Sequence, residues 1–168
     1  MLEEGYAAHR TVLVSELLVK LKSASPSFFE QVVVDLLVAM GYGGSRQDAG
    51  RAVGRTGDGG IDGIIKEDRL GLDAVYVQAK RWESTVGRPV VQAFAGSLEG
   101  HRARKGVLIT TSDFSSDARD YVTRIEKRIV LVGGDELAEL MVEHEIGVTE
   151  VARYTLKRLD GDYFDESE

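Results

Sequence analysis

Two stretches near the middle of the chain, residues 61–66 and 74–81, are apolar segments of the length and composition of β-strands. The segment between them, residues 68–73, contains Asp and Gly, which favour tight turns. The pattern therefore predicts an antiparallel hairpin. Asp62 follows a glycine cluster and opens the first of the two strands.

The second strand of this hairpin divides its side chains between two faces. Because successive side chains on a strand point to opposite faces, strict alternation places one set toward a core and the other set on the opposite face. The first set is Val75, Val77 and Ala79, and the second is Tyr76, Gln78 and Lys80. We expect the second face to present an amide and an ammonium group side by side, close to Asp62.

Helical periodicity precedes the hairpin. Residues 9–22 place apolar side chains at helical spacing, which predicts an amphipathic helix ahead of the core. Ser25 and Pro26 form an N-cap and first-turn pair for a second helix, whose broad apolar stripe ends at Gly41. Glu30 lies one residue off this stripe and is expected at the border of the buried face.

Strands and helices alternate in the second half of the chain. Residues 106–111 and 128–132 have the pattern of short strands, and a helix is expected after each. This alternation predicts a central mixed sheet with a parallel second half, in a three-layer α/β/α sandwich. Residues 148–159 are expected to add a terminal strand or helix, and residues 160–168 form an acidic tail.

Composition narrows the class of protein. With 168 residues, of which 43% are hydrophobic, the chain is long enough for one domain with a buried core. It has no cysteine, which excludes disulfides and thiolate metal sites. No apolar run near the N-terminus has the length of a signal peptide or membrane span, so the protein is expected in the cytoplasm.

The net charge of −7 argues against a nucleic-acid partner until its distribution is considered. Residues 80–105 contain six basic and two acidic residues, whereas residues 135–168 contain eleven acidic and three basic residues. The basic side chains that we expect to contact DNA phosphates are Arg81, Arg88, Arg102, Arg104 and Lys105. Arg46, Arg51 and Arg55 in a glycine-rich segment are further candidates. A solvated charged surface is the alternative.

The hairpin carries residues suited to metal-assisted hydrolysis of a phosphodiester. A hard divalent cation requires oxygen ligands, which the Asp62 carboxylate, the Gln78 side-chain carbonyl and the Ala79 main-chain carbonyl can supply. Lys80 can orient a water molecule or stabilise negative charge on the phosphate. Taken singly, Asp62 is equally consistent with a turn residue and Lys80 with a solvated side chain; their combination favours a site.

Three motifs carry a resemblance to a known family: FFEQVVVDLLVAMGY (residues 28–42), GDGGIDG (residues 57–63) and VYVQAKRW (residues 75–82). Through them the chain resembles the Mrr-like restriction endonucleases, a branch of the PD-(D/E)-x-K nuclease superfamily. The resemblance implies a metal-dependent DNA endonuclease core that uses Mg²⁺ or Mn²⁺. It implies Asp62 as principal metal ligand, Gln78 in place of the usual acidic residue, Lys80 as the catalytic lysine and Glu30 as an accessory acid.

The resemblance also implies restriction of foreign or modified, for example methylated, double-stranded DNA. Cutting both strands requires two such sites, so a homodimer or higher homo-oligomer is expected. Residues 1–25 are expected to be a helical connection, residues 26–159 the nuclease domain and residues 160–168 the tail. Two alternatives remain open, a nuclease-like fold that binds DNA without cutting it and a protein-interaction domain.

Overall fold

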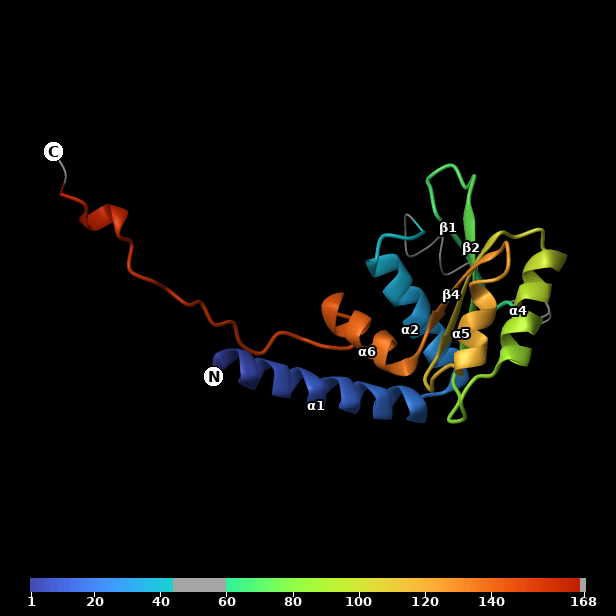
Figure 1. Ribbon diagram of the computed structural model, residues 1–168, viewed down its shortest axis with the longest axis horizontal. Helices are drawn as coiled ribbons and strands as arrows, with labels where there is room; N and C mark the ends of the chain where they lie inside the picture. Colours follow the sequence, from blue (N-terminus) through green and yellow to red (C-terminus); the bar gives the residue numbers. More distant parts are fainter. Residues whose placement is uncertain (44–59, 167–168) are drawn as a thin grey trace.

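The computed structural model describes residues 1–43 and 60–166. In these residues four strands form one mixed sheet in the order β1-β2-β3-β4 (Figure 1). They are β1 (Gly63–Lys66), β2 (Ala74–Lys80), β3 (Lys105–Thr110) and β4 (Arg128–Val132). β1 runs antiparallel to β2, whereas β2, β3 and β4 are parallel, so the predicted hairpin and parallel second half are confirmed.

The turn of the hairpin is organised by one carboxylate. The two oxygens of Asp68 accept the backbone N–H groups of Leu70 (2.8 Å), Leu72 (3.2 Å) and Asp73 (2.8 Å). These bonds satisfy the main-chain donors of the turn. They fix the register in which Gly63 lies opposite Val77.

Helices cover both faces of the sheet. On one face lie α2 (Pro26–Ala39) and α6 (Gly134–Glu143), and on the other α4 (Arg88–Gly100) and α5 (Ser116–Val122) (Figure 1). Each face has its own apolar cluster, which includes Phe29, Leu36 and Val77 on the first side and Val91, Phe94 and Leu108 on the second. The predicted α/β/α sandwich is confirmed.

This double coverage corrects the sequence prediction for β2, which assigned only one of its faces to a core. Val77 is 2% exposed, but its neighbour Gln78 is only 6% exposed, and Tyr76 packs against the α4 side. A strand in the middle of a three-layer sandwich is buried on both faces. Gln78 is therefore a buried polar side chain.

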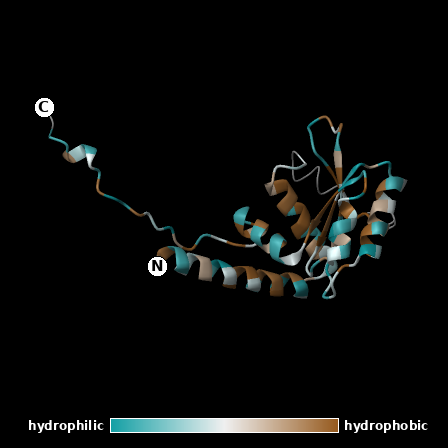
Figure 2. Cartoon of the chain, viewed as in Figure 1, coloured by the Kyte–Doolittle hydropathy of each residue, from teal (hydrophilic) through white to brown (hydrophobic). Residues whose placement is uncertain are grey.

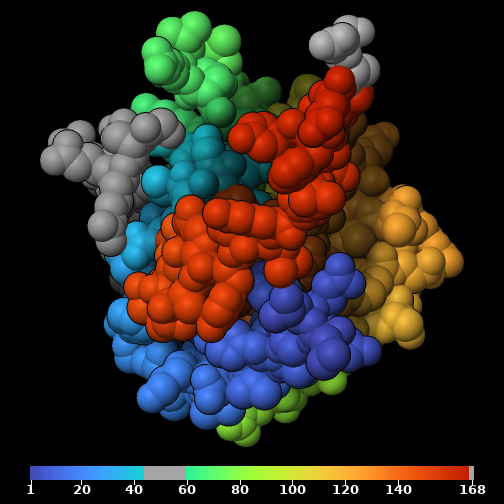
Figure 3. All heavy atoms as spheres, turned by 90° about the vertical axis from the view of Figure 1, so that its left-hand side faces the viewer, coloured from blue at the N-terminus to red at the C-terminus, as the bar shows by residue number. Residues whose placement is uncertain are grey.

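The first two helices follow local signals. Ser25 accepts a hydrogen bond from the backbone N–H of Phe28 (3.2 Å) and Pro26 is the first residue of α2, as predicted. α1 (Leu2–Ser23) starts earlier than the predicted residue 9. Its buried side chains Val14 and Leu17 belong to the cluster that contains Leu137 of α6, and the space-filling view shows α1 lying against α6 (Figure 3).

The carboxyl ends of the parallel strands meet the amino ends of helices at one edge of the sheet (Figure 1). Lys80 at the end of β2 accepts a hydrogen bond from the N–H of Thr111 after β3 (3.2 Å). Ser112 accepts one from the N–H of Gly134 at the start of α6 (2.8 Å). Ligands of open α/β sheets bind outside the carboxyl ends of the strands, so this edge is the expected position of a functional site.

The chain after α6 leaves the packed body. Residues 149–161 form no helix or strand, and only a short 3-10 helix, η1 (Asp162–Phe164), follows (Figure 1). The expectation of a terminal strand or helix at residues 148–159 was wrong, and the predicted start of the tail at residue 160 lies inside this extended segment. In Figure 2 the segment alternates between apolar and polar residues. None of the described helices is long and apolar enough to span a membrane.

Candidate active site

Asp62 is held at the edge of β2 by two hydrogen bonds. Its backbone N–H donates to the carbonyl of Val77 (2.8 Å), and its Oδ2 accepts the backbone N–H of Ala79 (2.7 Å). The carboxylate thus takes the place of a main-chain acceptor at the point where the β1–β2 ladder ends. This arrangement places an anionic oxygen directly beside Ala79.

A second carboxylate lies on the α2 side of Asp62. Glu30, in the second turn of α2, and Asp62 line one small hollow together with apolar side chains of α2 and β2. Burial raises the pKa of Glu30, and the charge of Asp62 raises it further. Burial also raises the pKa of Asp62, although the Ala79 N–H and the positive charge of Lys80 act in the opposite direction. A bound cation would relieve both the burial and the repulsion of these anions.

Gln78 lies against the glycine cluster that precedes Asp62. Gly60 has a φ of +91°, and a Cβ atom at this position would lie 2.5 Å from Nε2 of Gln78. A side chain at residue 60 would therefore be both strained and in the way of the amide. Since Gly60 touches Gln78 and Asp62 touches Ala79, residues 60–62 run alongside this part of β2.

Lys80 and Gln78 line a second, open hollow on the α4 side, with Trp82, Pro89 and Phe94 among its walls. The Lys80 Nζ lies 5.0 Å from the centroid of the Trp82 ring, a cation–π contact. The Trp82 carbonyl accepts a hydrogen bond from Oγ1 of Thr111 (2.8 Å). Thr111 thus anchors the chain on which both Lys80 and Trp82 are carried.

The four predicted site residues therefore surround one point of β2, at Ala79. Glu30 and Asp62 approach it from the α2 side, and Gln78 and Lys80 border it on the α4 side. Within residues 1–43 and 60–166, no group of three His, Cys, Asp or Glu side chains could hold a metal ion. A cation at this point would need an amide or main-chain oxygen beside the carboxylate, and Gln78 and Ala79 are the residues of β2 next to Asp62 that carry such oxygens.

The basic residues expected to contact DNA are divided between the two ends of the sheet. Arg81 and Arg88 lie at the carboxyl edge, where Arg81 Nη1 donates to the carbonyl of Lys22 (2.9 Å) at the end of α1. Arg88 Nη1 lies 3.5 Å from Asp117, and its guanidinium stacks 5.1 Å from the Tyr121 ring centroid.

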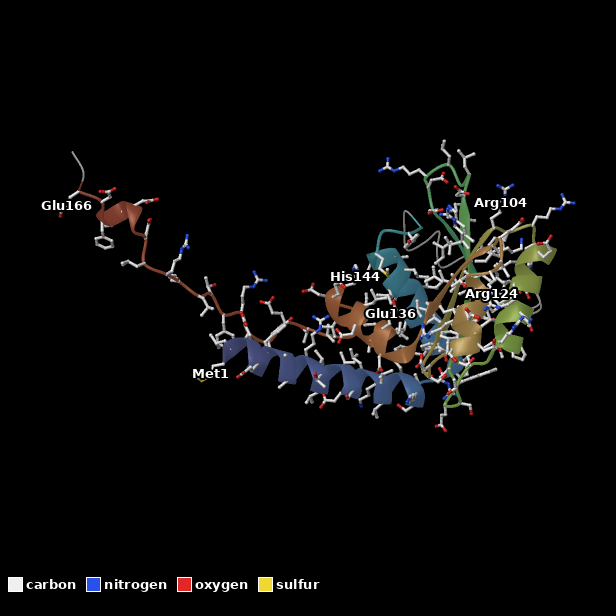
Figure 4. The ribbon with its side chains drawn as sticks, in the orientation of Figure 1. Met1, Arg104, Arg124, Glu136, His144 and Glu166 are labelled. Carbon is white, nitrogen blue, oxygen red and sulfur yellow. The ribbon has the colours of Figure 1, made fainter. Side chains whose placement is uncertain are left out.

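The other three, Arg102, Arg104 and Lys105, lie where β3 begins, roughly 16 Å away along the strand. Arg104 is labelled at this end in Figure 4. Lys105 is paired there with Glu67 (2.5 Å) and Asp73 (3.4 Å). One continuous basic surface is therefore not formed by these five residues. Arg46, Arg51 and Arg55 lie outside the described residues.

The contacts of three residues at the site were not predicted from the sequence. Gly60 and Trp82 belong to the motifs quoted above, but their contacts with Gln78 and Lys80 depend on how the chain folds. Thr111 belongs to the hydroxyl-bearing residues 110–112 at a strand end, which the sequence offers equally as phosphate contacts or as caps of the next turn. Its role as an anchor follows from the parallel pairing of β2 with β3, which no local pattern indicates.

Comparison with known proteins agrees with this arrangement. The family model described as a restriction endonuclease, that of the Mrr catalytic domain, matches residues 21–141. The chain belongs to the Mrr restriction endonuclease family. The resemblance inferred from the three motifs is confirmed, and enzymes of this family generally use divalent metal ions.

One curated relative and one solved structure extend this finding. The chain is 51% identical over 164 residues to the type IV methyl-directed restriction enzyme EcoKMrr of Escherichia coli (strain K12). The match covers 98% of this chain and 53% of the relative, so this Mrr-family chain spans about half the relative's length. The MspJI restriction endonuclease, solved with a 27-mer oligonucleotide, has the same fold, with a TM-score of 0.56 and 24% identity over 79% of this chain and 31% of that one.

Proposed function

We propose that this chain is a metal-dependent DNA endonuclease domain that hydrolyses phosphodiester bonds and serves to restrict foreign or modified DNA. The observation that carries the proposal is the position of Asp62, fixed beside Ala79 with Glu30 on one side and Gln78 and Lys80 on the other. Two half-buried acids whose pKa values are raised are costly for the fold without a cation, and such costs are typical of functional sites.

The ion would be held by the Asp62 carboxylate, the Gln78 side-chain oxygen and the main-chain carbonyl of Ala79, a set of hard oxygen ligands that suits Mg²⁺ or Mn²⁺. When bound, a divalent ion polarises the phosphate and lowers the pKa of water. Glu30, whose pKa is raised, is placed to accept a proton near Asp62.

Lys80 is assigned to the phosphate. Its ammonium donates hydrogen bonds but cannot ligate a cation, so it would stabilise the negative charge that develops on the phosphate oxygens. The ammonium lies over the Trp82 ring, and both residues line the open hollow on the α4 side. DNA would therefore approach the carboxyl edge of the sheet.

The test is nicking of a supercoiled plasmid in Mg²⁺, Mn²⁺ or EDTA. Asp62→Asn is expected to lose nicking by orders of magnitude and to bind divalent ions more weakly in calorimetry. Lys80→Ala is expected to lose nicking while it keeps ion affinity. Glu126→Gln, which changes an exposed acid on another part of the surface, is the control. Nicking at the parental rate by a folded Asp62→Asn or Lys80→Ala protein would refute the assignment.

The two ends of the sheet allow the DNA position to be tested separately. If DNA lies across the carboxyl edge, Arg88→Ala should flatten the dependence of binding on salt by roughly 0.9 log units per lost phosphate contact. Arg104→Ala should leave the salt dependence unchanged. The opposite result would place the DNA footprint at the amino end of β3, with Arg102 and Lys105.

A second candidate function is DNA binding without cleavage. It is favoured by the neutral Gln78 at a position where an acid would bind the cation more tightly. Retardation of DNA on a gel without metal-dependent nicking would decide for it.

If the chain is an endonuclease, cleavage of both DNA strands requires two copies of the site. We therefore infer a homodimer or higher homo-oligomer. We place its action in the cytoplasm as a separate part of the proposal.

A further inference from the structure

The extended segment after α6, residues 149–165, is named here the C-terminal arm. Six of its large apolar side chains are 62–86% exposed: Val151, Tyr154, Leu156, Leu159, Tyr163 and Phe164. Its salt bridge between Arg153 and Glu150 (2.8 Å) joins residues of the arm itself. Apolar side chains in this number on a segment that has no strand and only one short 3-10 helix are typical of a chain that is covered by a partner.

A groove on the sheet offers matching apolar surface. It is a hollow of about 340 Å³ between α2 and α6, and its floor is formed by β3 and β4. Leu36 and Met40 form one wall, Leu140 lies at the other, and Val107 and Val130 form part of the floor. Val130 is 55% exposed although the residues on either side of it in β4 are buried. The helices on this face thus leave part of the floor uncovered.

The groove is bordered by a free strand edge. β4 is the last strand of the sheet, and among the described strands it pairs only with β3. The outer edge of such a strand presents unpaired N–H and C=O groups that can bind another strand. Part of the arm has the pattern this requires, since Ala152, Tyr154 and Leu156 alternate with Arg153, Thr155 and Lys157.

We propose that the arm of one copy of this chain docks on the groove of a second copy and adds a strand to the outer edge of β4. Tyr154 and Leu156 would face the groove and cover Val130. In a two-fold dimer each chain would give an arm and receive one. The proposal is independent of the metal and DNA chemistry proposed above.

The direction of the arm favours a second copy over the chain's own groove. The arm passes the amino-terminal end of α1 and runs away from the sheet (Figure 1), and Figure 3 shows it projecting from the face formed by α1 and α6.

Charge indicates the direction in which the docked arm runs along β4. Exposed Arg104 and Arg128 lie at the amino ends of β3 and β4, and the acidic residues Asp160 and Asp162 follow Tyr154 and Leu156 along the arm. An arm antiparallel to β4 would bring these charges together.

The absence of cysteine from the chain makes disulfide trapping a direct test. Val130→Cys and Leu156→Cys proteins, carrying tags of different size, are mixed and oxidised. We expect a disulfide-linked heterodimer on a non-reducing gel. The control replaces Val130→Cys by Val19→Cys, since Val19 is an exposed apolar residue of α1 (66%), and should give only background cross-linking. Equal cross-linking in both mixtures would overturn the proposal.

The double variant distinguishes a partner's groove from the chain's own. Val130→Cys with Leu156→Cys in one chain should migrate as a covalent dimer. A disulfide formed within a monomer would show that the arm folds back on its own groove, which contradicts exchange between copies. Failure to form any disulfide would also contradict it.

Sedimentation provides a second, independent measurement. The parent protein should be a dimer, and Tyr154→Asp with Leu156→Asp should weaken self-association at least about 30-fold, the effect expected of central interface anchors. Because both residues are exposed on the arm, the variant should keep its fold, which far-UV circular dichroism would check, although its Tm falls by the stabilisation that association gave the parent. Val19→Asp should remain dimeric. A parent protein that is monomeric, or an arm variant that stays dimeric, would refute the docking surface.

Discussion

The contact between Gly60 and Gln78 gives a prediction that connects backbone conformation with metal affinity. Gly60→Ala places a Cβ atom at a φ of +91°, a conformation that L residues adopt at a cost of about 1–2 kcal/mol. The same Cβ would lie 2.5 Å from Nε2 of Gln78, so the amide must move. The substitution is therefore expected to act on both the free energy of unfolding and the site.

The strain and the displaced amide give expected changes in the free energy of unfolding and in divalent-ion affinity. Alanine restricts the unfolded chain, which offsets about 0.4–1 kcal/mol of the strain, so the free energy of unfolding should fall by about 1 kcal/mol. For a chain of this size that lowers Tm by roughly 2–4 °C. Displacement of the Gln78 amide should weaken divalent-ion affinity about 10–100-fold, as when a group that orients metal ligands is lost.

The assay is a double-mutant cycle. Ion affinity is measured by calorimetry, and stability by thermal melting in EDTA, for Gly60→Ala, Gln78→Ala and the double variant. If Gly60 acts through Gln78, the double variant should bind ions as weakly as Gln78→Ala and no more weakly. Gly96→Ala is the control, because Gly96 lies in α4 with open space at its Cβ position. It should raise stability by about 0.5–1 kcal/mol and leave ion affinity unchanged.

The reasoning fails in two distinguishable ways. If Gln78→Ala weakens ion binding and Gly60→Ala does not, Gly60 does not position the amide. If neither substitution changes ion affinity, Gln78 is not a ligand and the cation must be held by other groups near Asp62.

Three further results are expected. Burial raises the pKa values of Glu30 and Asp62, so the two acids lose their protons at lower pH in the unfolded chain than in the native protein. The free energy of unfolding of the metal-free protein therefore falls as the pH rises from the ordinary pKa values of these acids through their raised values in the native protein. Glu30→Gln and Asp62→Asn should therefore raise Tm at pH 7 in EDTA, and the gain should vanish below the ordinary pKa values of the two acids. Gln78→Glu should tighten divalent-ion binding in calorimetry, because it replaces a neutral ligand by an anionic one; equal affinity would remove residue 78 from the ligand set. Gly106→Ala should lower the free energy of unfolding by about 1–3 kcal/mol in urea, since its Cβ would lie 2.7 Å from Cζ of Phe94. An unchanged value would show that α4 can shift.

The sequence by itself determined the features that depend on neighbours along the chain. The Ser25 cap, the apolar stripe of α2 and the hairpin turn at Asp68 follow from side chains a few residues apart. The motif around Asp62 and the alternation of strands and helices were enough to indicate the family and the three-layer fold.

Only the tertiary structure decided which groups meet across the sheet. Helices on both faces bury Gln78, which alternation alone placed on an outer face, and packing of α2 brings Glu30 to Asp62. Parallel pairing of β2 with β3 puts Arg88 and Arg104 at opposite ends, although both belong to one basic segment of the sequence. Periodicity specifies the faces of an element but not its neighbours, because strand order and helix coverage depend on contacts between residues far apart in the chain.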